Sequence, residues 1–200
     1  MKNLIINLFL ISSMIAYSQN EQTDKICKEY DQKIQTAIDE EVIYAVPQIQ
    51  ITTTLSKRAI GPVNHKITIY FDEYEIEIEE GEEVSFHKEA VIRKVEFTIA
   101  SVSYQIDYHY YFDEGGLLIR YDEKEIGYEC VHTTTYFKDK EPTRIVQKPL
   151  TDENCQAEKP AESFDKKELG KREKAEATWI LDEAKKFREL LFLNYEFVKN

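Results

Sequence analysis

The chain has 200 residues and a formal net charge of −12, because 38 Asp and Glu outnumber 26 Lys and Arg. Such a negative surface repels phosphate groups, which argues against nucleic acid and anionic membrane surfaces as partners. Hydrophobic residues make up 42% of the chain, with 13 Tyr and 10 Phe. This content argues against a disordered protein and favours β-sheet.

Residues 1–18 have the composition of a secretory signal peptide. Lys2 supplies a positive start, Leu4–Ile15 form an apolar run, and Ala16–Ser18 is a small-x-small cleavage site. The alternative, a retained membrane anchor, is disfavoured because the apolar run is shorter than the roughly 20 residues that cross a bilayer. We therefore expect a periplasmic or secreted protein in which residues 19–200 form a single domain without a transmembrane segment.

Two segments have the period of amphipathic helices. In residues 21–41, apolar side chains recur every three or four positions with charged residues between them. A second helix is expected after the polar connector 151–163, where Asp165–Glu168 match a capping box. Gly170 is expected either to break this helix or to delay its start. Strong helix formers follow from Lys171. The apolar stripe of this second helix consists of Ala177, Ile180, Leu181, Ala184, Phe187, Leu190 and Leu191.

The middle of the chain has the alternation of β-strands, and two changes of phase predict bends or turns. Residues 48–56 alternate regularly. In residues 66–79 the apolar positions change from odd to even near Asp72, which fits either a hairpin or a bulge in one long strand. Residues 91–112 change phase at Ala100, where no Gly, Pro, Asn or Asp favours a turn, so one long bent strand is expected.

A clear turn signal lies at Asp113–Gly116, and a hairpin around it would pair Phe112 with Leu117. Residues 126–137 and 143–149 supply further strands. The expected fold is α+β, with a curved antiparallel meander of about six to eight strands flanked by an N-terminal helix and a long C-terminal helix.

The chain has three cysteines, so at most one internal disulfide forms and one thiol is left over. A hairpin around residues 138–142 would bring Cys130 opposite residue 150, close to Cys155. We therefore expect a Cys130–Cys155 disulfide, worth about 3 kcal/mol of stability, with Cys27 free. The alternatives are that all three thiols are reduced, or that Cys27 bonds to one of the other two.

A stripe of aromatic residues is the candidate ligand-binding surface. It consists of Tyr104, Tyr108, Tyr110, Phe112 and Tyr121, which the alternation places on one face of the sheet. An open stripe would hold a sugar, a peptide or an apolar ligand, whereas a stripe covered by the C-terminal helix would be core.

No sequence pattern typical of catalysis, cofactor binding or a metal centre is found. A nucleophile motif and a Gly-rich phosphate loop are both absent, and no His lies at metal-ligand spacing from another His or Cys. The acidic run between Glu75 and Glu83 lacks the Asp and Asn pattern of a calcium loop. We therefore assign no catalytic residue, cofactor or metal from the sequence.

Three segments of the chain carry a resemblance to other proteins: Thr54–Glu73, Phe112–Tyr121 and the signal end Tyr17-Ser18-Gln19. They resemble small exported proteins of Gram-negative bacteria with no assigned function. The resemblance implies export and a β-rich fold, and it carries over no activity. The favoured hypothesis is an exported, non-enzymatic protein that uses its curved sheet to bind an unknown protein, peptide or glycan. The alternative is a periplasmic hydrolase with carboxylate chemistry, which requires a cleft of convergent carboxylates with shifted pKa values.

Overall fold

A computed structural model describes residues 2–42, 45–57, 61–80, 83–127, 129–150, 155 and 161–198. The chain divides into two compact units, residues 1–42 and 43–200. Within these described residues, the first unit contains one long helix, and the second contains eight antiparallel strands and a C-terminal helix. The α+β fold expected from the sequence is thereby confirmed.

The long helix of the first unit, α1 (Lys2–Asp39), includes most of the helix predicted for residues 21–41. The chain leaves the helix at Glu41, whose φ of 57° lies in the left-handed region, and the Val42 N–H donates to the Ala37 carbonyl at 2.9 Å. Cleavage within the N-terminal part of α1 stays a prediction. No helix in the described part of the chain is both long and apolar enough to cross a membrane.

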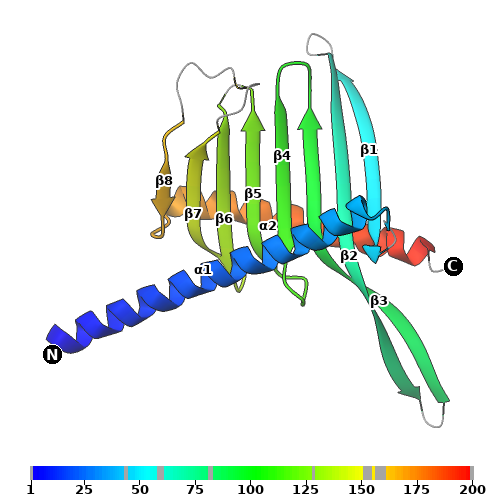
Figure 1. Cartoon of the computed structure of the whole chain (residues 1–200), viewed down its shortest axis with the longest axis horizontal. Coiled ribbons are helices and arrows are strands. Elements are labelled where there is room, and N and C mark those ends of the chain that lie inside the picture. Colours follow the sequence, from blue (N-terminus) through cyan, green and yellow to red (C-terminus); the bar gives the residue numbers. More distant parts are fainter. Residues whose placement is uncertain are drawn as a thin grey trace. The chain divides into compact units, whose positions relative to one another are not determined.

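The second unit is built on one open eight-stranded sheet, in which each strand pairs with its neighbours along the chain (Figure 1). The strands are β1 (Gln48–Lys57), β2 (Gly61–Glu80), β3 (Glu83–Ala100), β4 (Gln105–Phe112), β5 (Leu118–Ile126), β6 (Val131–Lys138), β7 (Glu141–Pro149) and β8 (Phe164–Lys166). All of these pairings are antiparallel. The two edges of this meander are β1 and β8.

The C-terminal helix, α2 (Lys171–Val198), crosses one face of the sheet, and the hydrophobic core lies between them (Figure 1). The helix contributes Ala177, Ile180, Ala184, Phe187 and Leu191, all buried. The sheet contributes Ile69, Phe71, Ile92, Val95, Tyr110, Phe112, Leu118, Tyr121 and Phe137. The helical spacing of the first set therefore identifies the face of α2 that packs on the sheet.

The start of α2 differs from the capping-box prediction, because Asp165 belongs to β8. There the Asp165 carboxylate accepts hydrogen bonds from the Arg144 guanidinium at 2.8 and 2.7 Å. The helix is capped instead at Gly170, whose N–H donates to Glu173 Oε2 at 3.0 Å. Since α2 begins at Lys171, Gly170 delays the helix and does not break it.

The first change of phase lies in one long strand, β2, and not in a hairpin. The pairing of β2 with β3 shifts between Tyr70 and Phe71, and Arg93 on β3 is the extra residue of the bulge. Because β2 itself alternates without interruption, its apolar residues pass from one face of the sheet to the other. Phe71 is buried in the core, whereas Tyr74 and Ile76 are exposed.

The expectation of one long strand over residues 91–112 is wrong, because a tight turn joins β3 to β4. Ala100 pairs with Gln105, and the Ser101 N–H donates to the Tyr104 carbonyl at 2.9 Å. The Ser101 side chain supplies the missing turn chemistry. Its Oγ accepts hydrogen bonds from the N–H groups of Ser103 and Tyr104, each at 3.3 Å.

The hairpin predicted around Asp113–Gly116 is present, but its register differs from the prediction. Phe112 pairs with Leu118, and a bulge lies next to this pair. Leu117 belongs to the turn, because its N–H donates to Asp113 Oδ1 at 2.8 Å and its carbonyl accepts from the Asp113 N–H at 2.9 Å. Asp113 therefore lengthens the loop by one residue.

The face of the sheet opposite α2 has a row of alternating cations and aromatic rings. Paired residues of six neighbouring strands form it: Tyr70, Lys94, Tyr111, Arg120, Tyr136 and Arg144. Four cation–ring contacts in the row have centroid distances of 5.3 to 6.0 Å. Glu96, Asp122 and Asp165 form ion pairs with the same cations. Side chains as well as backbone hydrogen bonds therefore link these strands.

Candidate functional site

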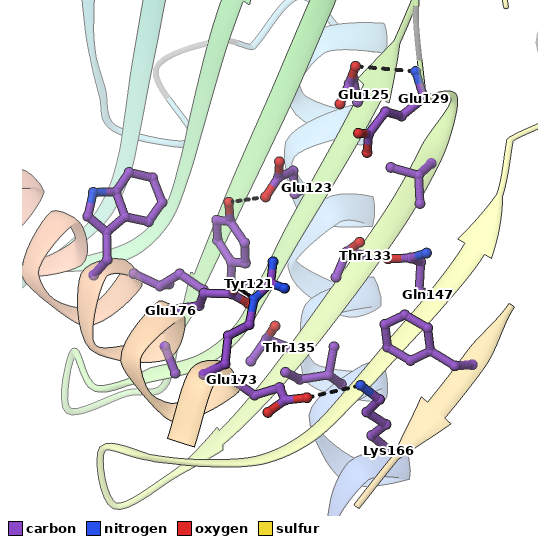
Figure 2. A pocket seen from close by; sticks show the side chains of 17 residues that line it. Tyr121, Glu123, Glu125, Glu129, Thr133, Thr135, Gln147, Lys166, Glu173 and Glu176 are labelled. Atoms are coloured by element: carbon purple, nitrogen blue, oxygen red, sulfur yellow. Dashed lines mark hydrogen bonds and ion pairs between the residues drawn. The ribbon is translucent and has the colours of Figure 1, made fainter. Parts of the chain in front are cut away.

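A cavity of about 610 Å³ lies between the first turns of α2 and strands β5 to β8 (Figure 2). The sheet forms its floor and the helix forms one wall. Its lining combines aromatic and aliphatic side chains with carboxylates, hydroxyls and an amide. Both its size and its mixed lining are typical of small-molecule sites, which measure roughly 300–1,000 Å³.

The register of β5 to β8 builds the floor of the cavity from two rows of paired residues. The first row consists of Tyr121, Thr135, Ile145 and Lys166, and the second consists of Glu123, Thr133, Gln147 and Phe164. Residues paired across antiparallel strands share one face of the sheet. Both rows therefore line the cavity on the side that faces α2.

Two ion pairs hold the wall at the start of α2. Lys166 Nζ on β8 lies 2.9 Å from Glu173 Oε1 on the helix, and Arg172 Nε lies 2.9 Å from Glu176 Oε1 one turn further. The cations of the lining are therefore matched by carboxylates of the wall. Trp179 continues the wall with a side chain that is 52% exposed.

Glu123 lies among several carboxylates in the cavity. Burial raises the pKa of Glu123, the hydrogen bond from Tyr121 opposes this, and the carboxylates of Glu125, Glu129 and Glu176 raise the pKa further. None of the ion pairs between described residues involves Glu123, Glu125 or Glu129. This side of the cavity consequently has an excess of negative charge.

The Tyr121 hydroxyl is a fixed hydrogen-bond donor in this environment. It donates to Glu123 Oε2 at 2.9 Å (Figure 2). Burial, the charge of Glu123 and this hydrogen bond raise the pKa of Tyr121, so the phenol keeps its proton. The bond orients the Glu123 carboxylate along β5.

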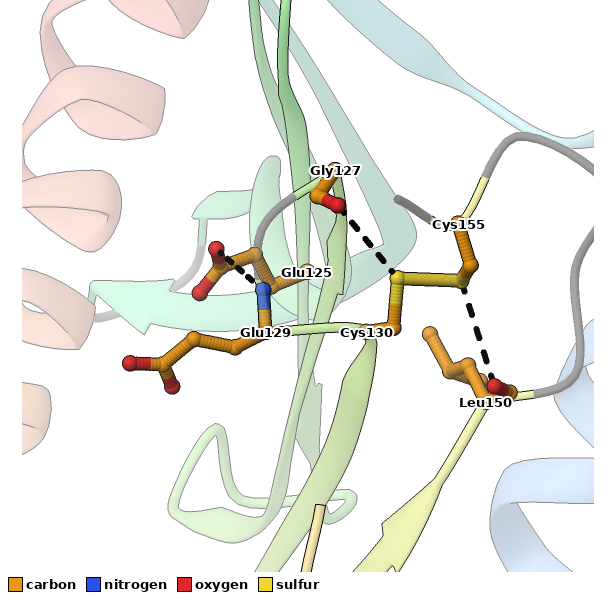
Figure 3. Close-up of a disulfide and its surroundings, with 6 residues drawn as sticks. All are labelled: Glu125, Gly127, Glu129, Cys130, Leu150 and Cys155. Carbon is orange, nitrogen blue, oxygen red and sulfur yellow. Dashed lines mark hydrogen bonds between the residues drawn. A yellow bond between two sulfur atoms is a disulfide. The ribbon is translucent and has the colours of Figure 1, made fainter. Parts of the chain in front are cut away.

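The predicted Cys130–Cys155 disulfide is confirmed, with Cα atoms 5.6 Å apart (Figure 3). Cys27 is buried and belongs to no disulfide. Glu129 directly precedes Cys130, and its N–H donates to Glu125 Oε1 at 3.4 Å. Glu129, which lines the cavity, therefore lies next to both the disulfide and this hydrogen bond.

The backbone of Gly127, just after β5, makes a close approach to the β3–β4 turn. Its φ of 138° is a conformation that favours glycine, and an added Cβ would lie 2.9 Å from the Ser103 carbonyl oxygen. The same Cβ would lie 3.2 Å from Tyr104. Gly127 thus packs directly against the β3–β4 turn, where no side chain fits.

The structure divides the predicted aromatic stripe between core and cavity. Tyr110 and Phe112 are buried, and the partly buried Tyr108 packs against the core cluster that includes α2. Tyr104 ends the β3–β4 turn. Tyr121 is buried as well, but it also lines the cavity. A ligand-binding role for the stripe stays a prediction, and Tyr121 is the member for which the geometry offers a ligand space.

The sequence-based stripe does not include several residues that line the cavity. Trp179 lies on the helix, Gln147 reaches the floor through the pairing of β6 with β7, and Phe164 reaches it through the pairing of β7 with β8. The sequence does indicate the place of Glu123 and Glu125, because they continue the core-facing alternation that starts at Tyr121. Carboxylates at inward positions of a strand are unusual in a plain core and indicate a polar space there.

In the part of the chain that the structure describes, no group of three or more His, Cys, Asp or Glu residues is placed to hold a metal ion. Comparison of the chain with family models, with curated proteins and with solved structures finds no match.

Proposed function

We propose that the protein is an exported, non-enzymatic binding protein that takes a basic peptide side chain into the cavity between α2 and β5 to β8. The observation that supports the proposal is the cavity itself, about 610 Å³ in volume and lined by both apolar and hydrogen-bonding groups. A sheet that holds such a space next to a helix gives a ligand a rigid floor.

The charge and the rings of the lining favour a cationic ligand. Glu123, Glu125 and Glu129 present carboxylates, which form strong charge-assisted hydrogen bonds with ammonium and guanidinium groups. Trp179 and Phe164 add aromatic rings, which attract cations and pack against aliphatic stems. A Lys or Arg side chain of a peptide combines both properties.

Trp179 gives a direct test, because it is the only tryptophan of the chain and lines the cavity. We expect its fluorescence to change saturably when trilysine is titrated into the purified protein. Triglutamate, the control peptide of opposite charge, should leave the emission unchanged. A Trp179→Phe variant should show no signal. An emission that does not respond to trilysine contradicts the proposed ligand.

Glu123→Gln is expected to weaken trilysine binding about tenfold, because it removes one charge-assisted contact. Glu141→Gln, which removes an exposed carboxylate of β7 outside the cavity, is the matched control and should bind normally. Protonation removes the same charge, so affinity should fall as the pH falls through the raised pKa of Glu123. In Glu123→Gln this fall should begin at lower pH. Equal affinities of the two variants would contradict a role for Glu123.

The second candidate function is a hydrolase, and the raised pKa of Glu123 is the observation that favours it. A carboxyl group that stays protonated at higher pH than usual can serve as a general acid. The same Glu123→Gln variant separates the two functions. If the protein is a hydrolase with Glu123 as general acid, the variant would turn over its substrate more slowly but bind that substrate with unchanged affinity. If it is the proposed binding protein, the variant would bind trilysine more weakly.

Export is supported by the signal-like residues 1–18 and by the Cys130–Cys155 disulfide, since disulfides persist in oxidising compartments. We expect the intact mass of protein recovered from periplasm or culture medium to correspond to a chain that begins at Gln19. Recovery of the protein only from the cytoplasm, with residues 1–18 retained, would contradict export.

A further inference from the structure

The edge strand β1 is long and open to solvent. It spans ten residues, and among the strands of the described chain it pairs only with β2, so its outer edge presents backbone N–H and C=O groups outside the ladder. Gln50 and residues 52–56 are exposed, and Leu55 is 47% exposed although it is apolar. A second strand could therefore pair along most of β1.

The opposite edge of the sheet has the features that prevent such pairing, and β1 lacks them. The strand β8 has three residues, of which Asp165 and Lys166 are charged, and β7 beside it contains Pro142 and Pro149. Short length, charge and proline are the usual protection of sheet edges. Within β1 there is no proline, and its single charged residue is Lys57 at the end.

The charge distribution also favours pairing at this edge. The segment from Gln48 to Phe71 contains no Asp or Glu, although the whole chain has 38 of them. Repulsion between two copies of so acidic a protein is therefore weakest where β1 edges meet. A second copy of this chain can approach β1 with less electrostatic cost than it can approach the acidic remainder.

We propose that two copies of the protein pair through β1, antiparallel, about a two-fold axis at Thr52. This register aligns Ile49 of one copy with Leu55 of the other, and it keeps Lys57 outside the pair. Ile49 packs against the core on the α2 face, and by alternation Leu55 lies on that same face. Pairing would thus place the exposed Leu55 beside an apolar side chain and join the two sheets into one.

The end of α2 adds to the same contact. In Figure 1 the C-terminal part of α2 projects beyond β1. In the pair, this end would lie over the α2 face of the second copy's β1, where its Leu55 is exposed. The inference does not depend on the proposed ligand, because β1 does not line the cavity.

Sedimentation equilibrium of the purified protein tests the pairing. We expect a reversible dimer whose dissociation constant increases about tenfold or more in Thr52→Lys, because this change places two like charges opposite each other at the axis. Thr178→Lys, which makes the same change at an exposed position of α2, should leave the dimer unchanged. A protein that is monomeric at every concentration, or equal effects of the two variants, would overturn the proposal.

Oxidative cross-linking tests the register. Thr52→Cys should form a covalent dimer, because the two new thiols face each other across the axis. Thr54→Cys is the matched control: its partner position is Gln50, so it should not cross-link. The unsubstituted protein gives the background, since Cys27, the cysteine outside the disulfide, is buried. Cross-linking of Thr54→Cys but not of Thr52→Cys would overturn the proposed axis.

Discussion

Phe187→Ala is expected to lower the free energy of unfolding by about 4 kcal/mol, the largest effect of a single substitution argued for this protein. Phe187 is 5% exposed and lies on the face of α2 that packs on the sheet. Its ring contacts Tyr110 and Phe97 edge-on, with centroids 5.1 and 6.2 Å away. The substitution removes these contacts and leaves a cavity where helix and sheet meet. Urea denaturation measured by far-UV circular dichroism gives the change.

Phe192→Ala is the matched control, since it makes the same change on the same helix at a side chain that is 66% exposed. Its effect should stay within about 0.5 kcal/mol. The comparison separates packing from helix propensity, because both variants gain the same propensity from alanine. Similar losses in the two variants would contradict the placement of the core between α2 and the sheet.

The strands and α2 could be predicted because hydrophobic periodicity reports directly on burial. Ala177, Ile180, Ala184 and Phe187 follow the helical period, and each is buried against the sheet. The disulfide could be predicted for a similar reason. The hairpin that turns at residues 138–142 limits how far apart the two cysteines can lie. Periodicity was sufficient to predict the strands and α2, and one predicted turn was sufficient to predict the disulfide.

Two predictions were wrong, the continuous strand over residues 91–112 and the register of the next hairpin. In both places the structure depends on one side chain, whose effect composition does not reveal. The β3–β4 turn forms because the Ser101 hydroxyl accepts two backbone hydrogen bonds, so a stretch without Gly, Pro, Asn or Asp still reverses direction. The register of the next hairpin shifts because Asp113 takes Leu117 into the turn. In both cases a side chain forms hydrogen bonds with nearby backbone N–H groups, and the pattern of apolar residues gives no information about such bonds.

The candidate site could be predicted only in part from the sequence, because its lining comes from segments that are far apart in the chain. Tyr121 was predicted as a ligand-binding residue and does line the cavity, whereas Trp179 and Phe164 join it through the packing of α2 and the pairing of β8. The acidic positions Glu123 and Glu125 are the informative exception. Their inward placement on β5 is readable from alternation alone, once the hairpin at Asp113–Gly116 fixes the face of Tyr121.

Loss of the disulfide in the double variant Cys130→Ala/Cys155→Ala is expected to lower the free energy of unfolding by about 3 kcal/mol. The bridge spans 25 residues of sequence, and its removal gives this segment more freedom in the unfolded chain. Reducing the unsubstituted protein with dithiothreitol should shift its urea midpoint to that of the variant. The variant itself should be insensitive to the reductant, and if it responds, the effect does not come from this bridge.

The same variant distinguishes a role in stability from a role in the cavity. Glu129 precedes Cys130 and lines the cavity, while Gly127 packs against the β3–β4 turn. If the disulfide positions Glu129, trilysine affinity should fall about threefold to tenfold in the variant under conditions where it is fully folded, as one carboxylate becomes mobile. If affinity is unchanged while stability falls, Gly127 and the Glu125 contact suffice to place Glu129, and the bridge acts on the unfolded chain alone. Either result assigns the disulfide a distinct physical role.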